Sequence, residues 1–547
     1  MAELVLGPVL RHVGETDATV WVETDERCEV EVLGHRQGTF HVEGHHYALV
    51  YIEKLERGSE HEYEVALDGE RRWPPADSEL PPSRIRTLDP DKVFRIVFGS
   101  CRVAVPHESP YTLSKDEDDR GHEVDALYAL ANRMRATDAE DWPHLLLHLG
   151  DQVYADEGSP RARERIRAKR DTSQAPGEEV ADFEEYTWLY HEAWGHPLIR
   201  WLLSTVPSAM VFDDHDVHDD WNTSRAWLEE IRTEPWWDER VVGAFMSYWI
   251  YQHVGNLSSA ALEDDELFAR VRDADDAGPM LREFSRRADR ETEGSRWSYC
   301  RELGRTKLVV VDSRAGRVLA PDRRCMVDDG EWDWIVEESD GEFDHLLIAS
   351  TLPFLLGRGM HHLESWNEAV CDGAWGGWAA RIGERIRQGL DLEHWAAFRD
   401  SFERVTTLLR EIGSGARGRP PATIVCLGGD VHHAYLADVA FPRGSGVESA
   451  VYQAVCSPFR NPLSSREQMA IRFGAGRVAE LLGRALNRAA GRGRPDIRWR
   501  FVEGPYFDNQ FAMLEVEGRS ANLRLEKTSS GDDAQPALET VFERPLA

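Results

Sequence analysis

Five apolar runs in the sequence are each followed directly by side chains that bind metal ions or transfer protons. These side chains are Cys101 in FGSC, Asp151 and Tyr154 in HLGDQVY, Asp214 and His215 in VFDDHD, Arg314 in VVVDSR, and Asp430 and His432 in LGGDVHH. Thiolate, carboxylate, phenolate and imidazole groups are common protein ligands of metal ions. The pattern therefore indicates a metal site assembled from several parts of the chain.

The acidic turn DDHD has two readings. It places Asp213, Asp214 and Asp216 around His215 at the end of an apolar run. Buried carboxylates at this density cost several kcal/mol unless a cation or a proton compensates them. The alternative is a solvated acidic turn, and the sequence leaves open which of the three aspartates binds metal.

The residues of the other motifs could also have structural roles instead of binding metal. An aspartate after a strand is often a helix N-cap, although Gly150 before Asp151 favours a tight turn that leaves the carboxylate at the strand tip. Cys101 alone is more typical of a buried thiol than of a ligand. In GGDVHH, Asp430 and His432 stand two positions apart and can face the same side of an extended turn.

The elements that would position these side chains are buried strands with helices between them. Apolar runs occupy 93–101, 144–151, 208–216, 307–314, 345–351, 423–433 and 451–458, and helical patterns occupy 123–136, 182–203, 225–253, 366–410 and 466–490. Strands without alternation are buried on both faces, as in a layered α/β core. Ligands in such folds bind beyond the carboxyl ends of the strands.

The first part of the chain differs from the rest. Segments 18–24, 28–33, 47–55 and 61–69 alternate apolar and polar residues, which predicts a small all-β sandwich of the fibronectin type III or immunoglobulin kind. A proline-rich link over 73–91 follows it. We therefore expect an all-β domain over 1–90, a catalytic domain over 91–527 and a flexible tail over 528–547.

Composition limits the partners and the compartment. The chain has 64 basic and 98 acidic side chains, a net charge of −34, which argues against nucleic acid or an anionic membrane as the main partner. Seven scattered cysteines without a CxxC pair favour a reducing compartment. With no signal-peptide pattern and no long apolar stretch, we expect a cytoplasmic protein.

Taken in order, FGSC, GDQVYAD, FDDHD, DSR, GGDVHH and CSP resemble the alkaline phosphatase D (PhoD-like) family of metallophosphatases. The resemblance implies a two-sheet metallophosphatase core behind a small all-β domain. It also implies a di- or trinuclear cluster of ferric iron with calcium, or with another divalent ion. The ligands that it implies are Cys101, Asp125 in GHEVDALYALA, Asp151, Tyr154, Asp214, Asp430 and His432.

The chemistry that follows is hydrolysis of a phosphoric ester. A hydroxide that bridges two metal ions attacks phosphorus, since metal binding lowers the pKa of water to about 7. By the same resemblance His215 protonates the leaving group, a contribution of about 10² to 10⁴ in rate. Arg314 either binds a phosphate oxygen or pairs with Asp312, and His218 or Asp219 is a further candidate at the acidic turn.

The expected substrate is a small phosphate ester, with monoester and diester left open. The alternative function is a non-catalytic scaffold or interaction protein that keeps the metal site on the same fold. The family ligand positions hold competent residues, which favours the hydrolase.

Overall fold

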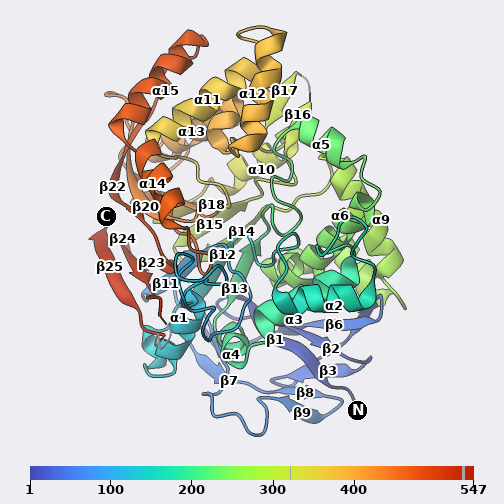
Figure 1. Ribbon diagram of the computed structural model, residues 1–547. Helices are drawn as coiled ribbons and strands as arrows, with labels where there is room; N and C mark the ends of the chain where they lie inside the picture. Colours follow the sequence, from blue (N-terminus) through green and yellow to red (C-terminus); the bar gives the residue numbers. More distant parts are fainter. Residues whose placement is uncertain (321, 532–535) are drawn as a thin grey trace.

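Two large sheets form the centre of the computed structural model, which describes residues 1–320, 322–531 and 536–547 (Figure 1). The first sheet has six strands in the order β13-β12-β11-β23-β24-β25. They are β11 (Phe94–Gly99), β12 (Leu145–Leu149), β13 (Ser208–Val211), β23 (Gln510–Glu517), β24 (Ser520–Lys527) and β25 (Glu539–Pro545). The predicted α/β core behind an all-β segment is confirmed.

The second sheet has seven strands in the order β14-β15-β18-β19-β21-β20-β22. They are β14 (Tyr299–Leu303), β15 (Thr306–Val311), β18 (His345–Ser350), β19 (Thr423–Gly428), β20 (Ala434–Ala440), β21 (Ala450–Val455) and β22 (Arg498–Tyr506). The strands β15, β18, β19 and β21 are parallel, as are β11, β12 and β13 in the first sheet. Their carboxyl ends therefore reach one edge of each sheet.

Continuous apolar sequence places these strands between two layers of core. In β15, Leu308 and Val310 belong to the main core, whereas Val309 and Val311 face a second core. The second core includes residues of α10 (Asp329–Glu338) and α13 (Arg399–Gly413). Alternate residues of a strand point to opposite faces, so burial on both faces needs an unbroken apolar run.

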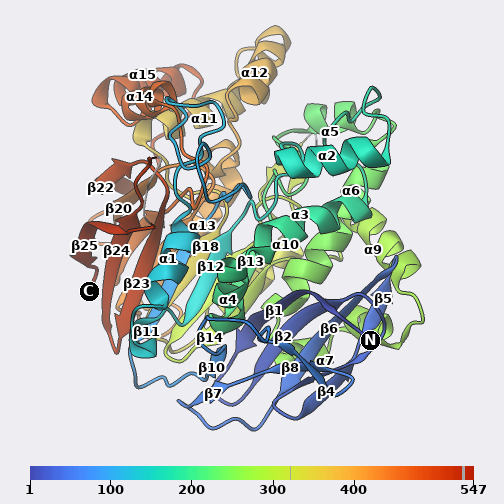
Figure 2. The ribbon, with the colours of Figure 1, turned by 60° about the horizontal axis from the view of Figure 1, so that its bottom comes forward.

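The N-terminal part consists of small antiparallel sheets, at the bottom of Figure 2. One has the order β1-β2-β6-β5 and the other β4-β3-β8-β9. Their strands are β1 (Leu4–Val13), β2 (Ala18–Thr24), β3 (Glu29–Val32), β4 (His35–Gly38), β5 (Phe40–Val42), β6 (His45–Ile52), β8 (Val65–Leu67) and β9 (Glu70–Trp73). A shared core between the two sheets contains Val20, Val30 and Val65.

The strand β2 is buried along its whole length, contrary to the simple alternation of its sequence. One face lies in the sandwich, and the other packs on helices of the α/β core. The rings of Trp21 and Tyr47 pack against the ring of Tyr251, with centroid distances of 5.2 Å and 5.6 Å. Polar Glu23 is also buried there, so the sandwich is joined to the core by a continuous interface.

Several predicted helices are divided in the structure. The pattern over 182–203 forms α3 (Phe183–Gly195) and α4 (Pro197–Thr205), because Pro197 begins a new helix at its first turn. The pattern over 366–410 contains parts of α11 (Arg358–Cys371), α12 (Gly377–Gly389) and α13. The pattern over 466–490 forms α14 (Ser465–Gly474) and α15 (Arg477–Ala489).

The flexible tail expected over 528–547 is wrong for its last part. Residues 539–545 form β25, which pairs antiparallel with β24 and closes the edge of the first sheet. Val541 and Phe542 pack against the main core, which explains why the segment is ordered. Residues 532–535 lie outside the described residues.

Candidate metal centre

The predicted site residues follow strands from both large sheets. Cys101 follows β11, Asp151 follows β12, and Asp213 and Asp214 follow β13, all in the first sheet. Asp430 follows β19 of the second sheet. The site therefore lies where the carboxyl ends of strands from the two sheets approach each other.

Two glycines permit this close approach. A Cβ on Gly150 would lie 2.6 Å from the Asp213 Cβ, and a Cβ on Gly429 would lie 2.8 Å from the Leu149 carbonyl oxygen. Side chains at either position would push the strand-end loops apart. The glycines in GD and GGD are thus needed for packing across the site.

The backbone at the site is held in an uncommon conformation. Cys101, Asp151, Asp430 and His432 all have positive φ, between 52° and 64°. Residues other than glycine adopt this left-handed region at a cost, and they do so most often at functional sites. At these four predicted ligands the chain turns sharply out of the extended conformation of the strand.

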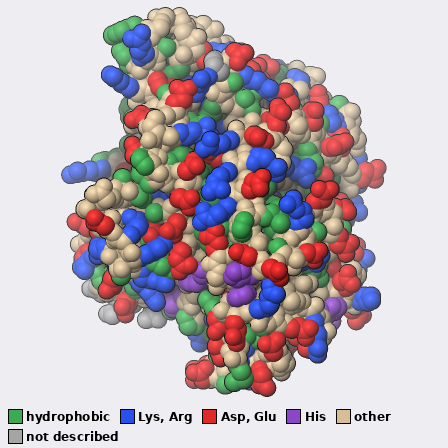
Figure 3. Space-filling model, turned by 90° about the vertical axis from the view of Figure 1, so that its right-hand side faces the viewer, with side chains coloured by type: hydrophobic (Ala, Val, Ile, Leu, Met, Phe, Trp, Pro, Cys, Tyr) green, Lys and Arg blue, Asp and Glu red, His purple; other side chains and the backbone are tan. Residues whose placement is uncertain are grey.

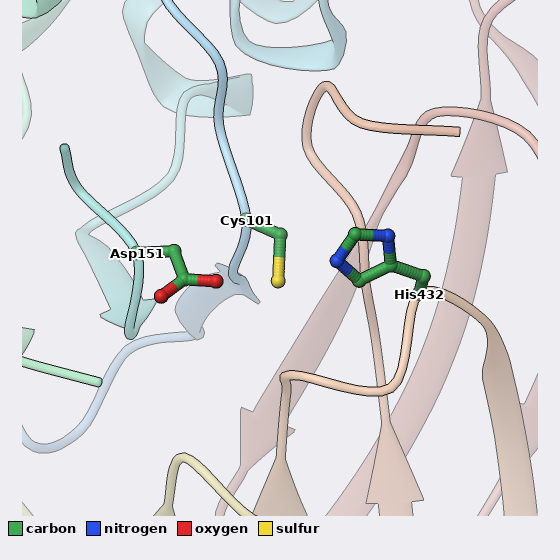
Figure 4. A group of neighbouring side chains, drawn as sticks. All are labelled: Cys101, Asp151 and His432. Atoms are coloured by element: carbon green, nitrogen blue, oxygen red, sulfur yellow. The ribbon is translucent and has the colours of Figure 1, made fainter. Parts of the chain in front are cut away.

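Three side chains form the first donor group, shown in Figure 4. One donor atom each of Cys101, Asp151 and His432 lie within 4.8 Å of one another. The Cys101 Sγ lies between the Asp151 carboxylate and the His432 ring. A thiol, a carboxylate and an imidazole from three loops are thus brought to one point.

A second donor group shares Asp151 with the first. Donor atoms of Asp151, Asp213 and Asp214 also lie within 4.8 Å of one another. Asp151 is therefore the residue that the two donor groups share. Of the three candidate aspartates at the acidic turn, Asp213 and Asp214 reach the group.

Asp216 serves the turn itself instead. Its carboxylate accepts hydrogen bonds from the backbone N–H groups of Asp151 at 3.1 Å, Val153 at 3.2 Å and Asp213 at 2.9 Å. These bonds tie the loop after β12 to the loop after β13. Within one motif, Asp213 and Asp214 thus belong to a donor group, whereas Asp216 holds the two loops together.

The donor set fits a cation. Asp151 Oδ1 and Asp213 Oδ2 are buried and have no hydrogen-bond partner among the described residues. Burial, together with neighbouring carboxylates that include Asp214, raises the pKa of both aspartates well above its ordinary value. Unpaired buried carboxylate oxygens are rare because they lose solvation, and a bound metal ion would supply the missing interaction.

The thiol of Cys101 also indicates a site for a cation. Burial and the nearby Asp151 and Asp430 raise the pKa of Cys101 well above its ordinary value. Its Sγ lies 3.2 Å from the hydroxyl oxygens of Ser100 and Ser457. A thiolate at this position therefore needs a positive partner, which a metal ion provides.

Tyr154 lies beside the bridging aspartate. Its hydroxyl donates to Asp151 Oδ2 at 3.3 Å and accepts from the Asn461 side-chain amide at 3.3 Å. The ring is buried, and burial followed by Asp151 raises the pKa of the phenol well above its ordinary value. The structure thus places this predicted ligand within contact of the donor group.

Asp430 lies on the other side of the site. Its carboxylate is 3.7 Å from Arg314 Nη2 and 3.5 Å from His394 Nε2. Burial opposes its charge, but His394 and Arg314 lower the pKa of Asp430 to about 2. The carboxylate therefore stays ionised next to the donor groups.

Arg314 is buried among carboxylates. Its guanidinium pairs with Asp213, with Asp214 at 3.2 Å and with Glu393 at 2.5 Å. The predicted alternative, an ion pair with Asp312, does not form, because the Asp312 carboxylate accepts backbone N–H groups, including that of Arg314 at 2.8 Å. Arg314 thus offsets only part of the negative charge of the acidic turn.

The structure gives Asp125 a role other than the predicted ligand. Its Oδ1 caps α1 (Ala126–Met134) by accepting from Leu127 N at 2.8 Å and Tyr128 N at 3.2 Å. Its Oδ2 accepts from Arg102 Nε at 2.8 Å. With both oxygens engaged, Asp125 belongs to neither donor group.

His215 sits at the rim of the site. Its Nδ1 lies 2.9 Å from Asp156 Oδ1, and its ring lies 4.7 Å from the Tyr154 ring, centroid to centroid. Burial disfavours its charged form, but Asp156, Asp151 and other carboxylates raise the pKa of His215 well above 6.5. His218 instead packs near Trp236 and hydrogen-bonds the Asp219 carbonyl at 2.8 Å.

The sequence did not indicate three residues that border the site. His394 Nδ1 lies 2.7 Å from Glu364 Oε1, and its Nε2 faces Asp430. Both His394 and Glu393, the partner of Arg314, lie between α12 and α13, and Glu364 lies on α11. They follow no apolar strand, so the strand-end pattern could not find them.

Two family models match parts of the chain. A family model described as PhoD-like phosphatase matches residues 123–273, and one described as a domain of unknown function (DUF7800) matches residues 1–85. No curated protein matches the chain significantly. In the described residues, no helix has the length and apolar character needed to cross a membrane.

The solved structure of PhoD has the same fold. It is 12% identical, with a TM-score of 0.59, and the alignment covers 100% of this chain and 92% of PhoD. A maltogenic amylase from S. marinus, 8% identical over 95% of this chain and 76% of its own, has a TM-score of 0.16, too low to carry an argument. The family model covers residues 123–273, which include Asp151 and the DDHD turn, so this part of the chain is similar to PhoD-like phosphatases.

Proposed function

We propose that the chain hydrolyses small phosphoric esters at a metal centre, with His215 as the proton donor to the leaving group. The observation that carries the proposal is the convergence of two buried donor groups on Asp151, one with Cys101 and His432 and one with Asp213 and Asp214. Two donor groups that share one carboxylate suit two neighbouring ions.

The chemistry of the donors suggests which ions they would hold. Cys101, Tyr154 and His432 supply thiolate, phenolate and imidazole, which suit ferric iron. Asp213, Asp214 and Asp430 supply carboxylate oxygens, which suit calcium or another divalent ion. When bound, such ions polarise the phosphoryl group and provide an activated water near neutral pH.

The proton donor is supported by its surroundings. A carboxylate only accepts, so the 2.9 Å contact with Asp156 fixes the proton of His215 on Nδ1. In the charged ring Nε2 also carries a proton, and the side chain is 19% exposed. His215 can therefore deliver the Nε2 proton to an alkoxide that leaves on the open side of the site.

The non-catalytic alternative is less well supported. A scaffold needs the metal ligands but has no use for a charged histidine beside them. His215 and Asp156 form a pair that holds such a proton at the rim, 19% and 8% exposed. Nothing in the site separates monoesters from diesters, so both substrates belong in the assay.

The test compares two esters in two variants. His215→Ala should keep its metal content and lose about 10² to 10⁴ in turnover on an alkyl phosphate. On a nitrophenyl phosphate, whose leaving group needs little protonation, the loss should be much smaller. Asp214→Ala should lose metal and activity on both esters together.

His218→Ala provides the matched control, because His218 belongs to the same turn but faces Trp236. It should keep activity on both esters. If His218→Ala shows the leaving-group dependence instead, the proton donor is assigned wrongly. If the metal-loaded protein hydrolyses neither ester, the scaffold alternative is favoured. A colourless active protein without iron would reject iron and leave the hydrolase in place.

A further inference from the structure

A polar surface cavity lies apart from the metal centre. Its walls are α5 (Arg225–Ile231), α11, α12, the start of α13 and the hairpin of β16 (Val318–Ala320) and β17 (Arg323–Cys325). Its volume is about 660 Å³, and it shares no residue with the two donor groups. Seven arginines line it, and six carboxylates line it with them. The arginines are Arg225, Arg323, Arg324, Arg381, Arg387, Arg399 and Arg492, and the acidic residues are Glu229, Asp322, Glu368, Asp372, Glu384 and Asp400.

This concentration is unusual for a chain with a net charge of −34. On the face that Figure 3 shows, basic and acidic side chains lie interspersed over the upper half. Clustered guanidinium groups repel one another unless anions lie between them. The question is therefore which of these arginines have a carboxylate partner.

Four of the seven are paired through carboxylates. The pairs are Arg225 with Glu229 at 2.6 Å, Arg323 with Asp329 at 2.5 Å, Arg399 with Glu403 at 2.6 Å, and Arg492 with Asp372 at 3.1 Å. A fifth, Arg387, is paired on one side only, through Nη1 to Glu384 at 3.0 Å.

Arg387 carries the strongest evidence for a missing partner. Its side chain is 6% exposed, and its Nε and Nη2 have no hydrogen-bond partner among the described residues. Buried guanidinium N–H groups without acceptors are costly. Arg387 therefore holds two buried donors without acceptors in the wall of the cavity that it lines.

Arg324 and Arg381 add positive charge that no described carboxylate balances within ion-pair distance. Arg324 donates only to backbone carbonyls, of Ala397 at 3.0 Å and Thr223 at 2.7 Å. Burial and the neighbouring Arg387 lower the pKa of Arg324 well below its ordinary value. An anion between these groups would relieve both the repulsion and the missing hydrogen bonds.

We propose that Arg324, Arg381 and Arg387 form a binding site for a compact phosphate-class oxyanion, separate from the metal centre. Guanidinium groups bind phosphate through paired, charge-assisted hydrogen bonds. Each of these three guanidinium groups has N–H donors that can bind phosphate oxygens. A cavity of about 660 Å³ accepts either anion, and pyrophosphate can contact more of the guanidinium groups.

Phosphate would also bind a metal-loaded active site, so the experiment uses the full-length Asp151→Asn chain stripped of metal. Titration calorimetry with inorganic phosphate, and separately with pyrophosphate, in chloride buffer should show one saturable site. Pyrophosphate should bind more tightly. Because Asp151 does not line the cavity, this outcome does not depend on the proposed hydrolase activity.

Two variants in that background locate the site. Arg387→Gln and Arg381→Gln should each weaken binding about tenfold or more, whereas Arg466→Gln on exposed α14 should not. Arg381 is exposed, so its replacement tests the site even if Arg387→Gln unfolds. Equal affinity in Arg381→Gln and Arg466→Gln, or no saturable binding of either anion, would overturn the proposal.

Discussion

His215 Nδ1 lies 2.9 Å from Asp156 Oδ1, and Asp156 Oδ2 accepts the backbone N–H of Asp219 at 2.6 Å. One carboxylate thus orients the imidazole and ties down the loop that follows the DDHD turn. Asp156 is five residues beyond Asp151, on the loop after β12. The ligand loop and the histidine loop are therefore coupled through a single side chain.

Asp156→Asn should separate orientation from metal binding. The amide removes the negative charge that raises the pKa of His215, so this pKa should fall and the alkaline limb of the rate profile should move to lower pH. We expect about tenfold or greater loss of kcat on an alkyl phosphate with unchanged metal content. Glu157→Gln, its exposed neighbour, is the control. An unmoved alkaline limb would contradict the assignment.

Asp125→Ala should weaken the fold and leave the metal content unchanged. The variant removes the cap of α1 and leaves the buried Arg102 without its partner, a combined cost of about 3–5 kcal/mol. Asp125→Asn can keep the cap and should cost less. Chemical denaturation and metal analysis check both variants. Loss of metal at unchanged stability would restore Asp125 as a ligand.

The strand-end residues could be predicted because each one is marked by a local sequence pattern. An unbroken apolar run followed by a polar residue places that residue at the carboxyl edge of a buried strand, as Asp151 and Asp430 show. Asp125 shows the limit of the resemblance, because a family ligand position and an N-cap look alike in sequence. Only the 2.8 Å contacts of Asp125 with Arg102 and Leu127 distinguish the N-cap from a ligand position.

The rest of the site depends on tertiary packing. His394 comes from the segment between α12 and α13, which reaches the site because α11 supplies Glu364 beneath it. Asp156 follows a predicted ligand, but its role depends on a histidine 59 residues away. No local pattern encodes such contacts, and β25 was likewise missed because its order comes from pairing with β24.

Asp151→Asn should change stability in opposite directions with and without metal. In the chelated protein the Asp151 carboxylate is buried near Asp213 and Asp214, and neutralising it removes repulsion. The melting temperature should rise by about 2 °C or more. In metal-supplied buffer the wild type should be the more stable protein, because it binds the ion more tightly. If Asp151→Asn changes the melting temperature in the same direction in both buffers, the result would argue against Asp151 as a ligand.

The interface between the N-terminal sheet and the core contains a buried ionic cluster. Glu23, 1% exposed, contacts His45 Nδ1 and His191 Nε2, each at 2.9 Å, and accepts from the Tyr251 hydroxyl at 2.9 Å. His45 Nε2 lies 2.8 Å from Glu184 on α3. Burial favours neutral imidazole, but Glu23 and Glu184 raise the pKa of His45 to about 8.

Stability should therefore depend on pH through His45. Its folded pKa of about 8 exceeds the ordinary 6.5, so its stabilisation is complete below pH 6.5 and is lost as pH rises through 8. The difference corresponds to at most about 2 kcal/mol. His45→Gln should flatten the fall in melting temperature between pH 6 and 9 and lower stability most at pH 6. His35→Gln, on the outer strand β4, should leave the profile unchanged. Parallel profiles for wild type and His45→Gln would show that this cluster does not couple the interface to pH.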